Sequence, residues 1–200
     1  FSDIVFSQPY ILAVGYTGAR ENNVGKVRLQ SLLSAANVDE NDSDGILIGG
    51  DIAPDNQRFV TATQNGIIKW WSVSGLVLDK FDTKSPYGSL LTIRFIDNTR
   101  VFIGFENGFY IFDFNPSTRG IAYTYSFPSR RISIPRGSTV AAFLTDDHTV
   151  QFVDVTGERL IPGVYTQDVT GFSSAKQASR RIVSIALSDY GEYLAIGRAD

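Results

Sequence analysis

Two matching pairs of arginines are the most promising ligand-binding residues in the sequence. Each pair follows a serine and precedes an isoleucine. The four residues are Arg130, Arg131, Arg180 and Arg181. Guanidinium groups bind carboxylates and phosphates through paired hydrogen bonds, so the pairs could form an anion site for a phosphopeptide, a phosphoinositide or an acidic partner. An arginine can also pair with a carboxylate of its own chain, such as Glu106 or Asp147, and we expect this structural role.

An acidic segment offers a second kind of chemistry, the binding of calcium. Glu40, Asp42 and Asp44 alternate ahead of a glycine, and Asp51 follows at the twelfth place. This is the spacing of a calcium loop, in which alternate carboxylates converge on the ion. The ninth place is Ile48, in an apolar run that suits a strand better than a metal site. We therefore expect the segment to bind calcium weakly or not at all, and we predict no cofactor.

The residues needed for catalysis are sparse. His148 is the only histidine and stands beside Asp146 and Asp147 in a polar turn, where we expect a turn residue rather than a catalytic base. The chain has no cysteine, so thiol nucleophiles, thiolate metal sites and disulfides are excluded. No phosphate-binding glycine loop and no serine-hydrolase motif occurs. We therefore predict that the protein is not an enzyme.

The composition is typical of a packed all-β protein without a nucleic-acid or membrane signature. The 200 residues are 43% hydrophobic and include 14 Phe, 9 Tyr and 2 Trp. The net charge is −3 and the basic residues are dispersed, so no nucleic-acid partner is predicted. No run reaches the roughly eighteen apolar residues of a membrane span, and no signal segment opens the sequence. We expect an intracellular protein, cytoplasmic or nuclear.

Residues 51–81 contain the clearest local pattern. Strand-like runs at 59–63 and 67–73 flank Asn65-Gly66, which is a strong signal for a β-hairpin. A further turn leads into a third run at 76–81. The stretch therefore predicts adjacent antiparallel strands, with its two tryptophans, Trp70 and Trp71, packed between sheets rather than forming a ligand platform.

This pattern repeats along the chain. Gly25, Gly66, Asn107 and His148 stand 41 residues apart, and each opens a β-rich run. A fifth unit starts at Ile182, after a polar stretch at 166–178 that we expect to be a surface loop. The predicted units span residues 1–45, 46–86, 87–128, 129–178 and 179–200. A period near 40–45 residues is typical of β-propeller blades, and the half-length fifth unit predicts a piece of a larger propeller.

The repeat resembles that of the WD40 family of β-propellers. Trp71-Ser72 stands at the family's Trp-Asp position, and Asn65, Glu106, Asp147 and Asp200 stand at the place of its hairpin aspartate. The resemblance implies four-stranded antiparallel blades, about four and a half in this chain, and a non-enzymatic scaffold that binds other proteins. The alternative is a propeller that binds a small ligand, calcium or an anionic partner.

The sequence departs from the WD40 pattern in two places. The family's Gly-His, which hydrogen-bonds through Ser or Thr to the blade tryptophan, is absent, and the arginine pairs stand ahead of the fourth and fifth units instead. The pairs match only half of the Phe-Arg-Arg-Gly motif of phosphoinositide-binding propellers. In the first unit, residues 31–38 suit a short helix or a poor outer strand, and we expect an acidic loop at 39–45.

Overall fold

The computed structural model shows β-strands as the regular elements of the residues that it describes. It describes residues 3–17, 24–34, 37–42, 44–84, 87–126, 128–136, 138–145, 149–155, 159–160, 182–188 and 192–198. No helix in these ranges is long and apolar enough to cross a membrane.

The strands form five antiparallel sheets that follow one another along the chain. The first contains β1 (Asp3–Ser7), β2 (Tyr10–Thr17), β3 (Val24–Ser31) and β4 (Asn37–Asp42). The second contains β5 (Leu47–Ile52), β6 (Arg58–Thr63), β7 (Ile67–Ser72) and β8 (Val77–Asp82). The third contains β9 (Leu90–Phe95), β10 (Arg100–Phe105), β11 (Gly108–Asp113) and β12 (Gly120–Ser126). The fourth contains β13 (Arg131–Ser133), β14 (Val140–Leu144), β15 (Val150–Asp154) and β16 (Arg159–Leu160), and the fifth pairs β17 (Ile182–Leu187) with β18 (Leu194–Arg198).

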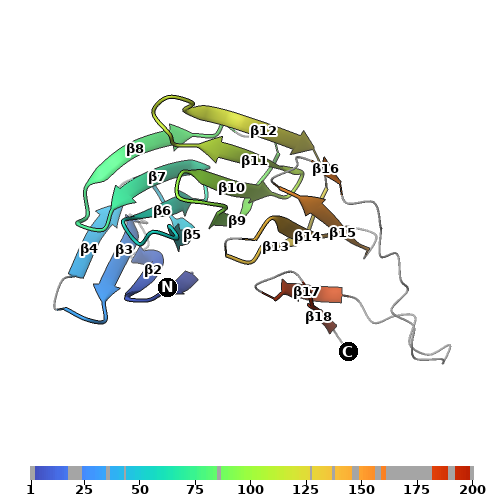
Figure 1. Ribbon diagram of the computed structural model, residues 1–200, viewed down its shortest axis with the longest axis horizontal. Coiled ribbons are helices and arrows are strands. Elements are labelled where there is room, and N and C mark those ends of the chain that lie inside the picture. Colours follow the sequence, from blue (N-terminus) through green and yellow to red (C-terminus); the bar gives the residue numbers. More distant parts are fainter. Residues whose placement is uncertain are drawn as a thin grey trace.

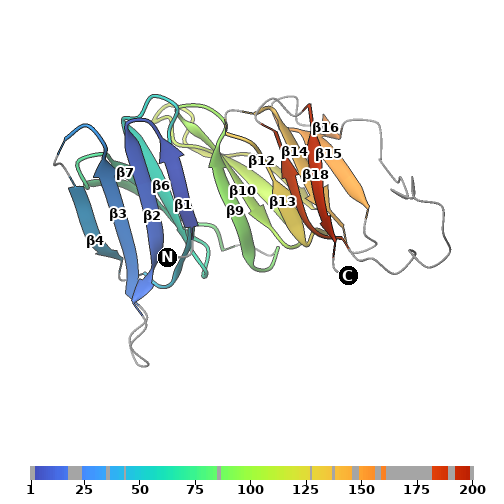
Figure 2. The same ribbon diagram turned by 90° about the horizontal axis from the view of Figure 1, so that it is seen from below.

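The sheets stand side by side in an arc (Figures 1 and 2). Within each sheet the spatial order of the strands is their order along the chain. The first strand of each sheet lies on the concave side of the arc, where β5 contacts β9 and β13 contacts β17. The last strands, such as β8 and β12, lie on the outside. The predicted all-β fold of repeated four-stranded antiparallel sheets is therefore confirmed, and the arrangement is consistent with propeller blades.

The hairpin between β6 and β7 shows why the sequence folds in this way. Gly66 has a φ of 81°, a left-handed conformation that glycine adopts without strain. Its N–H donates to Thr63 O at 3.0 Å, which closes the turn. The turn sets a register in which Phe59 lies opposite Trp71, and the two rings stack with centroids 5.6 Å apart. The predicted hairpin and the predicted packing of the tryptophans are both confirmed.

Alternating residues bury both faces of the middle sheets. In β10, Val101 and Ile103 pack against the second sheet, whereas Phe102 packs against the fourth. Side chains of a strand point alternately to opposite faces, so a run of apolar residues is required where both faces are covered. The core is therefore a series of layers between sheets, and each layer fixes the position of the next sheet.

The expectation of an acidic loop at 39–45 is wrong for residues 39–42. Residues 39–42 belong to the outer strand β4 rather than to a loop, because Asp39 lies opposite Arg28 and pairs with it (2.6 Å) and with Lys26 (3.2 Å). Of the segment 31–38, expected as a short helix or a poor outer strand, residues 32–34 bend away from β3, where Ser31 Oγ accepts from the N–H of Ser34, and the outer strand begins at Asn37. Asp51, the twelfth residue of the calcium-loop spacing, lies within β5. Cross-strand charge pairs thus keep an acidic sequence in a strand.

Candidate functional site

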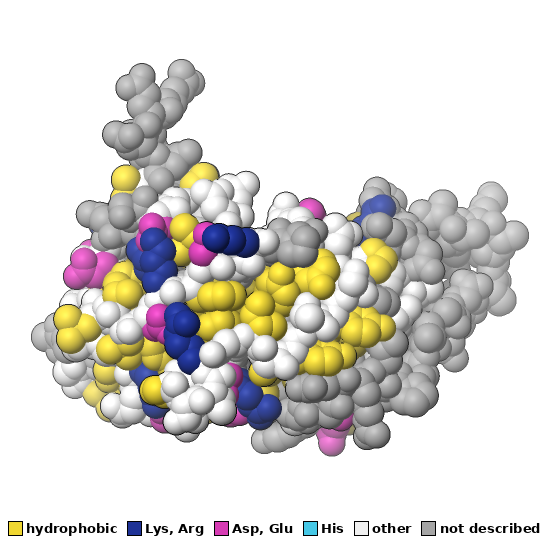
Figure 3. All heavy atoms as spheres, turned by 90° about the horizontal axis from the view of Figure 1, so that it is seen from above, with side chains coloured by type: hydrophobic (Ala, Val, Ile, Leu, Met, Phe, Trp, Pro, Cys, Tyr) yellow, Lys and Arg dark blue, Asp and Glu magenta, His cyan; other side chains and the backbone are white. Residues whose placement is uncertain are grey.

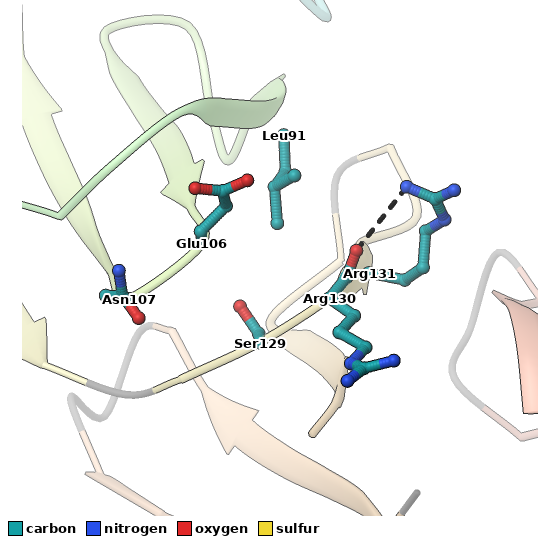
Figure 4. A pocket seen from close by; sticks show the side chains of 6 residues that line it. All are labelled: Leu91, Glu106, Asn107, Ser129, Arg130 and Arg131. Carbon is teal, nitrogen blue, oxygen red and sulfur yellow. Dashed lines mark hydrogen bonds between the residues drawn. The ribbon is translucent and has the colours of Figure 1, made fainter. Parts of the chain in front are cut away.

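A pocket of about 320 Å³ lies at the junction of the third and fourth sheets. It contains the first predicted arginine pair (Figure 4). Its lining residues are Leu91, Glu106, Asn107, Ser129, Arg130 and Arg131. We call this set the rim pocket, because it lies where the β10–β11 turn meets the connection from β12 to β13.

The floor of the rim pocket is held by backbone hydrogen bonds. The buried Ser129 donates from Oγ to Phe105 O (3.1 Å) and from its N–H to Glu106 O (2.6 Å). The next residue, Arg130, donates its N–H to Leu144 O (2.7 Å). These contacts join the connection to a strand of the third sheet and a strand of the fourth. The start of β13, which carries Arg131, is therefore fixed in place.

The expected pairing of the arginines with Glu106 does not form. In Figure 4 both arginine side chains extend away from Glu106, whose Oε2 accepts from the N–H of Ser89 at 3.1 Å. Within the described ranges, the exposed Arg131 side chain makes one long hydrogen bond, of 3.5 Å, to Arg130 O. Within the described part of the chain no carboxylate pairs with Arg131. Its guanidinium therefore presents donors to solvent beside a preformed hollow.

The other residues predicted for this kind of site lie outside the described residues. These are the second arginine pair, Arg180 and Arg181, and the turn that contains Asp147 and His148. The structure therefore shows the position of the first arginine pair. That the second pair occupies the equivalent position ahead of the fifth unit stays a prediction.

The acidic candidates for calcium are held by lysines or lie in strands. Asp44 pairs with Lys69 Nζ at 2.5 Å and with Lys80 Nζ at 2.6 Å. These two hydrogen bonds, that from Lys69 first, lower the pKa of Asp44. Glu40 lies on β4, and Asp42 closes that strand. No cluster of three metal-ligating side chains occurs among the described ranges. Two ammonium groups at Asp44 oppose a divalent cation by charge repulsion.

A second charged group, which the sequence analysis did not single out, lies on the concave side of the arc. We call it the inner-strand cluster; its members are Asp3, Asp51, Arg94 and Arg136. Asp51 is fully buried, and its carboxylate accepts from the N–H of Ile52 (2.9 Å) and the N–H of Phe95 (2.8 Å). Burial raises the pKa of Asp51, while the nearby Arg94 acts in the opposite direction. Asp51 thus joins the second sheet to the third.

The two arginines of this cluster bind mainly backbone carbonyl oxygens. Arg94 Nη1 donates to Gly50 O and to Ile93 O, both at 2.9 Å, and faces Asp3 Oδ2 at 3.4 Å. A carbonyl of the second sheet, a carbonyl of its own strand and a carboxylate of the first sheet therefore accept from this arginine on β9.

Arg136, which follows β13, reaches across the concave side of the arc. It donates to Phe6 O at 3.1 Å, to Ala53 O at 3.2 Å and to Ile52 O. Burial lowers its pKa, and Asp51 opposes that shift. One side chain of the fourth sheet thus holds the first and second sheets.

A signal for the inner-strand cluster is present in the sequence. Asp51, Arg94 and Arg136 are 43 and 42 residues apart, close to the 41-residue repeat, and each stands at or just after the end of the first strand of its sheet. Equivalent positions of a repeat lie near one another in space. A search for charged residues at the repeat interval would have grouped these three residues.

The buried face of the second sheet contains one further polar contact. Trp71 Nε1 donates to Thr61 Oγ1 at 3.0 Å, and both side chains are buried. A buried indole N–H normally finds such a partner. The contact joins β6 to β7 inside the sheet.

Comparisons with known proteins do not assign the chain to a family. No protein-family model matches it, and no curated protein matches it either.

Proposed function

We propose that the chain is part of a WD40-like propeller that acts as a non-enzymatic scaffold and binds other proteins. The repeated four-stranded sheets and the 41-residue interval support this proposal. The hydrogen bond from Trp71 to Thr61 also supports it, because it resembles the tryptophan-to-Ser/Thr part of the WD40 network. Stacked rigid sheets provide a fixed frame for binding residues in their connecting turns.

The rim pocket is the proposed binding site, and its ligand is an acidic segment of a partner protein. The observation that carries this proposal is the exposed Arg131 guanidinium, which has no carboxylate partner among the described residues and lies beside a hollow with an apolar wall at Leu91. A carboxylate can form a paired hydrogen bond with this group. Glu106 in the same pocket favours a singly charged carboxylate over a doubly charged phosphate, because like charges repel.

A peptide-binding measurement with matched variants tests this proposal. The probe is a short glutamate-rich synthetic peptide, and fluorescence anisotropy measures its affinity. We expect Arg131→Ala to weaken binding about tenfold, equivalent to about 1.4 kcal/mol. Arg28→Ala is the control, because Arg28 is also exposed but pairs with Asp39 on the first sheet. Added salt should weaken binding to the unmodified protein, because exposed charges are screened over about 8–10 Å.

The competing function is the binding of a small or lipid-borne anion. Inorganic phosphate and vesicles that contain a phosphoinositide are the probes for it. If either probe displaces the glutamate-rich peptide at a lower concentration than free glutamate does, the ligand of the rim pocket is a small or lipid-borne anion rather than a partner protein. Equal binding of the peptide to Arg131→Ala and to the unmodified protein would disprove the rim pocket as the site.

A further inference from the structure

The outer edge strands of the first three sheets differ in charge. β4 has the sequence NVDEND and β8 has VLDKFD, whereas β12 has GIAYTYS and contains no charged residue. Edge strands present unpaired backbone N–H and C=O groups, and proteins commonly place charges on them to prevent further pairing. A β-bulge does not distinguish β8 from β12, because each has one. β12 therefore lacks the charge protection that its two counterparts have.

The surface around β12 is open and apolar. Among the described strands β12 pairs with β11 alone, and its residues Ile121, Ala122, Thr124 and Ser126 are exposed. A Cβ placed on Gly120 would meet no atom within 4 Å. In Figure 3 hydrophobic side chains gather in the middle of the outer surface, where Figure 1 places β12, and charged side chains stand mainly on the side of β8. Arg119, which directly precedes β12, pairs with Asp79 of β8, and residues 120–126 themselves present no charged side chain to an additional strand.

Two half-buried tyrosines define the chemistry of such a strand. Tyr123 and Tyr125 lie on the face of the third sheet that is turned toward the fourth, where both pack against Phe109. A strand added to β12 would place alternate side chains beside these rings, and aromatic and β-branched cross-strand pairs are favourable.

We propose that β12 is a second interaction surface, on which an extended, uncharged segment of a partner protein adds as a fifth strand of the third sheet. The segment pairs with the regular part of the edge, residues 123–126, beyond the bulge, and has apolar residues at alternate positions. Backbone hydrogen bonds supply the affinity, and the tyrosines select the side chains. This surface is independent of the rim pocket, so neither proposal requires the other.

A second copy of the chain suits this edge less well than a flexible segment. If two copies paired through this edge, four regularly paired residues from each copy would form a small interface. Stable interfaces between folded proteins usually bury about 1,200–2,000 Å² in total. An extended segment can continue past the edge and cover the neighbouring apolar side chains, whereas a second rigid sheet meets only the strand.

Peptide binding and hydrogen–deuterium exchange test the proposal. The probe is a short synthetic peptide of alternating valine and threonine with capped ends. We expect it to protect the backbone amides of residues 123–126 from exchange. Ser126→Lys, at an exposed position of the edge, should weaken binding about fivefold, equivalent to about 1 kcal/mol. Leu78→Lys, which adds the same charge to the exposed surface of β8, should leave the affinity unchanged.

Backbone chemistry and self-association complete the test. The same peptide methylated at every second backbone nitrogen cannot donate to an edge strand, so we expect it not to bind. Equal binding of both peptides, no binding of either, or binding without protection of residues 123–126 would overturn the proposal. Light scattering should show that the protein is a monomer. A dimer that Ser126→Lys dissociates would show that a second copy of the chain occupies the edge, and it would overturn the proposal of a partner segment.

Discussion

The protein contains two groups of arginines that differ in what satisfies their hydrogen bonds. In the inner-strand cluster, Arg94 and Arg136 donate to backbone carbonyls of neighbouring sheets and lie near a buried carboxylate. In the rim pocket, Arg131 is exposed, and among the described residues its side chain donates only to the carbonyl of the preceding residue. The same side chain therefore joins sheets in one place and is available to a ligand in the other. Burial and the number of fixed acceptors decide which role an arginine has.

The largest effect on stability is expected for Asp51→Asn. An asparagine offers one acceptor oxygen, whereas the two carboxyl oxygens of Asp51 accept from two different N–H groups, so one buried N–H loses its acceptor. We expect a loss of about 3 kcal/mol in the free energy of unfolding, measured by urea denaturation. The control is Asp79→Asn, which breaks a more exposed pair with Arg119 and should cost about 1 kcal/mol or less. Equal losses in the two variants would contradict a special role for the buried carboxylate.

Arg136→Ala should have the next largest effect. The change leaves the carbonyls of Phe6, Ile52 and Ala53 without their donor and releases the fourth sheet from the first two. We expect a loss of about 2 kcal/mol and a lower melting temperature by calorimetry. Arg136→Lys keeps the charge but not the fork of donors and should restore only part of the loss. A melting temperature equal to that of the unmodified protein would show that the contacts of Arg136 do not stabilise the fold.

The two buried or paired aspartates should respond to pH with opposite signs. Burial raises the pKa of Asp51, so the stability that it contributes is full at low pH and is lost as the pH rises through its folded pKa. The hydrogen bonds from Lys69 and Lys80 lower the pKa of Asp44 from 3.8, so its contribution is full above that value and is lost as the pH falls through the folded pKa.

Urea denaturation across pH checks these signs. Asp44→Asn should flatten the loss of unfolding free energy below about pH 4, whereas Asp51→Asn should change the profile above it. Identical pH profiles for the two variants would show that the environments of these carboxylates do not differ as their contacts indicate.

The smallest effect on stability is expected for Arg131→Ala. Its side chain is exposed and lacks a carboxylate partner among the described residues, so the free energy of unfolding should change by less than about 0.5 kcal/mol. Calorimetry beside Arg136→Ala gives the direct comparison. A loss as large as that of Arg136→Ala would move Arg131 from the binding group to the structural group and remove the support for the rim pocket as a ligand site.

The fold was predictable from the sequence because its signals are local and repeat. Asn65-Gly66 specifies a hairpin, and the 41-residue interval repeats the same strand pattern along the chain. The outer strand β4, at 37–42, was misplaced, because the sequence of 39–42 is acidic and an outer strand was considered only for residues 31–38. Its place in the sheet depends on Lys26 and Arg28 of the neighbouring strand, which a local pattern does not include.

The sites depended more strongly on tertiary structure. The sequence alone identified Arg130 and Arg131 and their position ahead of a strand, because a doubled arginine is visible in the chain. Which way they point was decided by the fold: Ser89 binds Glu106 through its backbone N–H, and neither arginine side chain extends toward that carboxylate. Arg136 acquired its role in the same way. Its acceptors are the backbone carbonyls of Phe6 and of residues 52–53. Because every residue carries a backbone carbonyl, the sequence does not distinguish these acceptors, and only the stacking of the sheets brings them to Arg136.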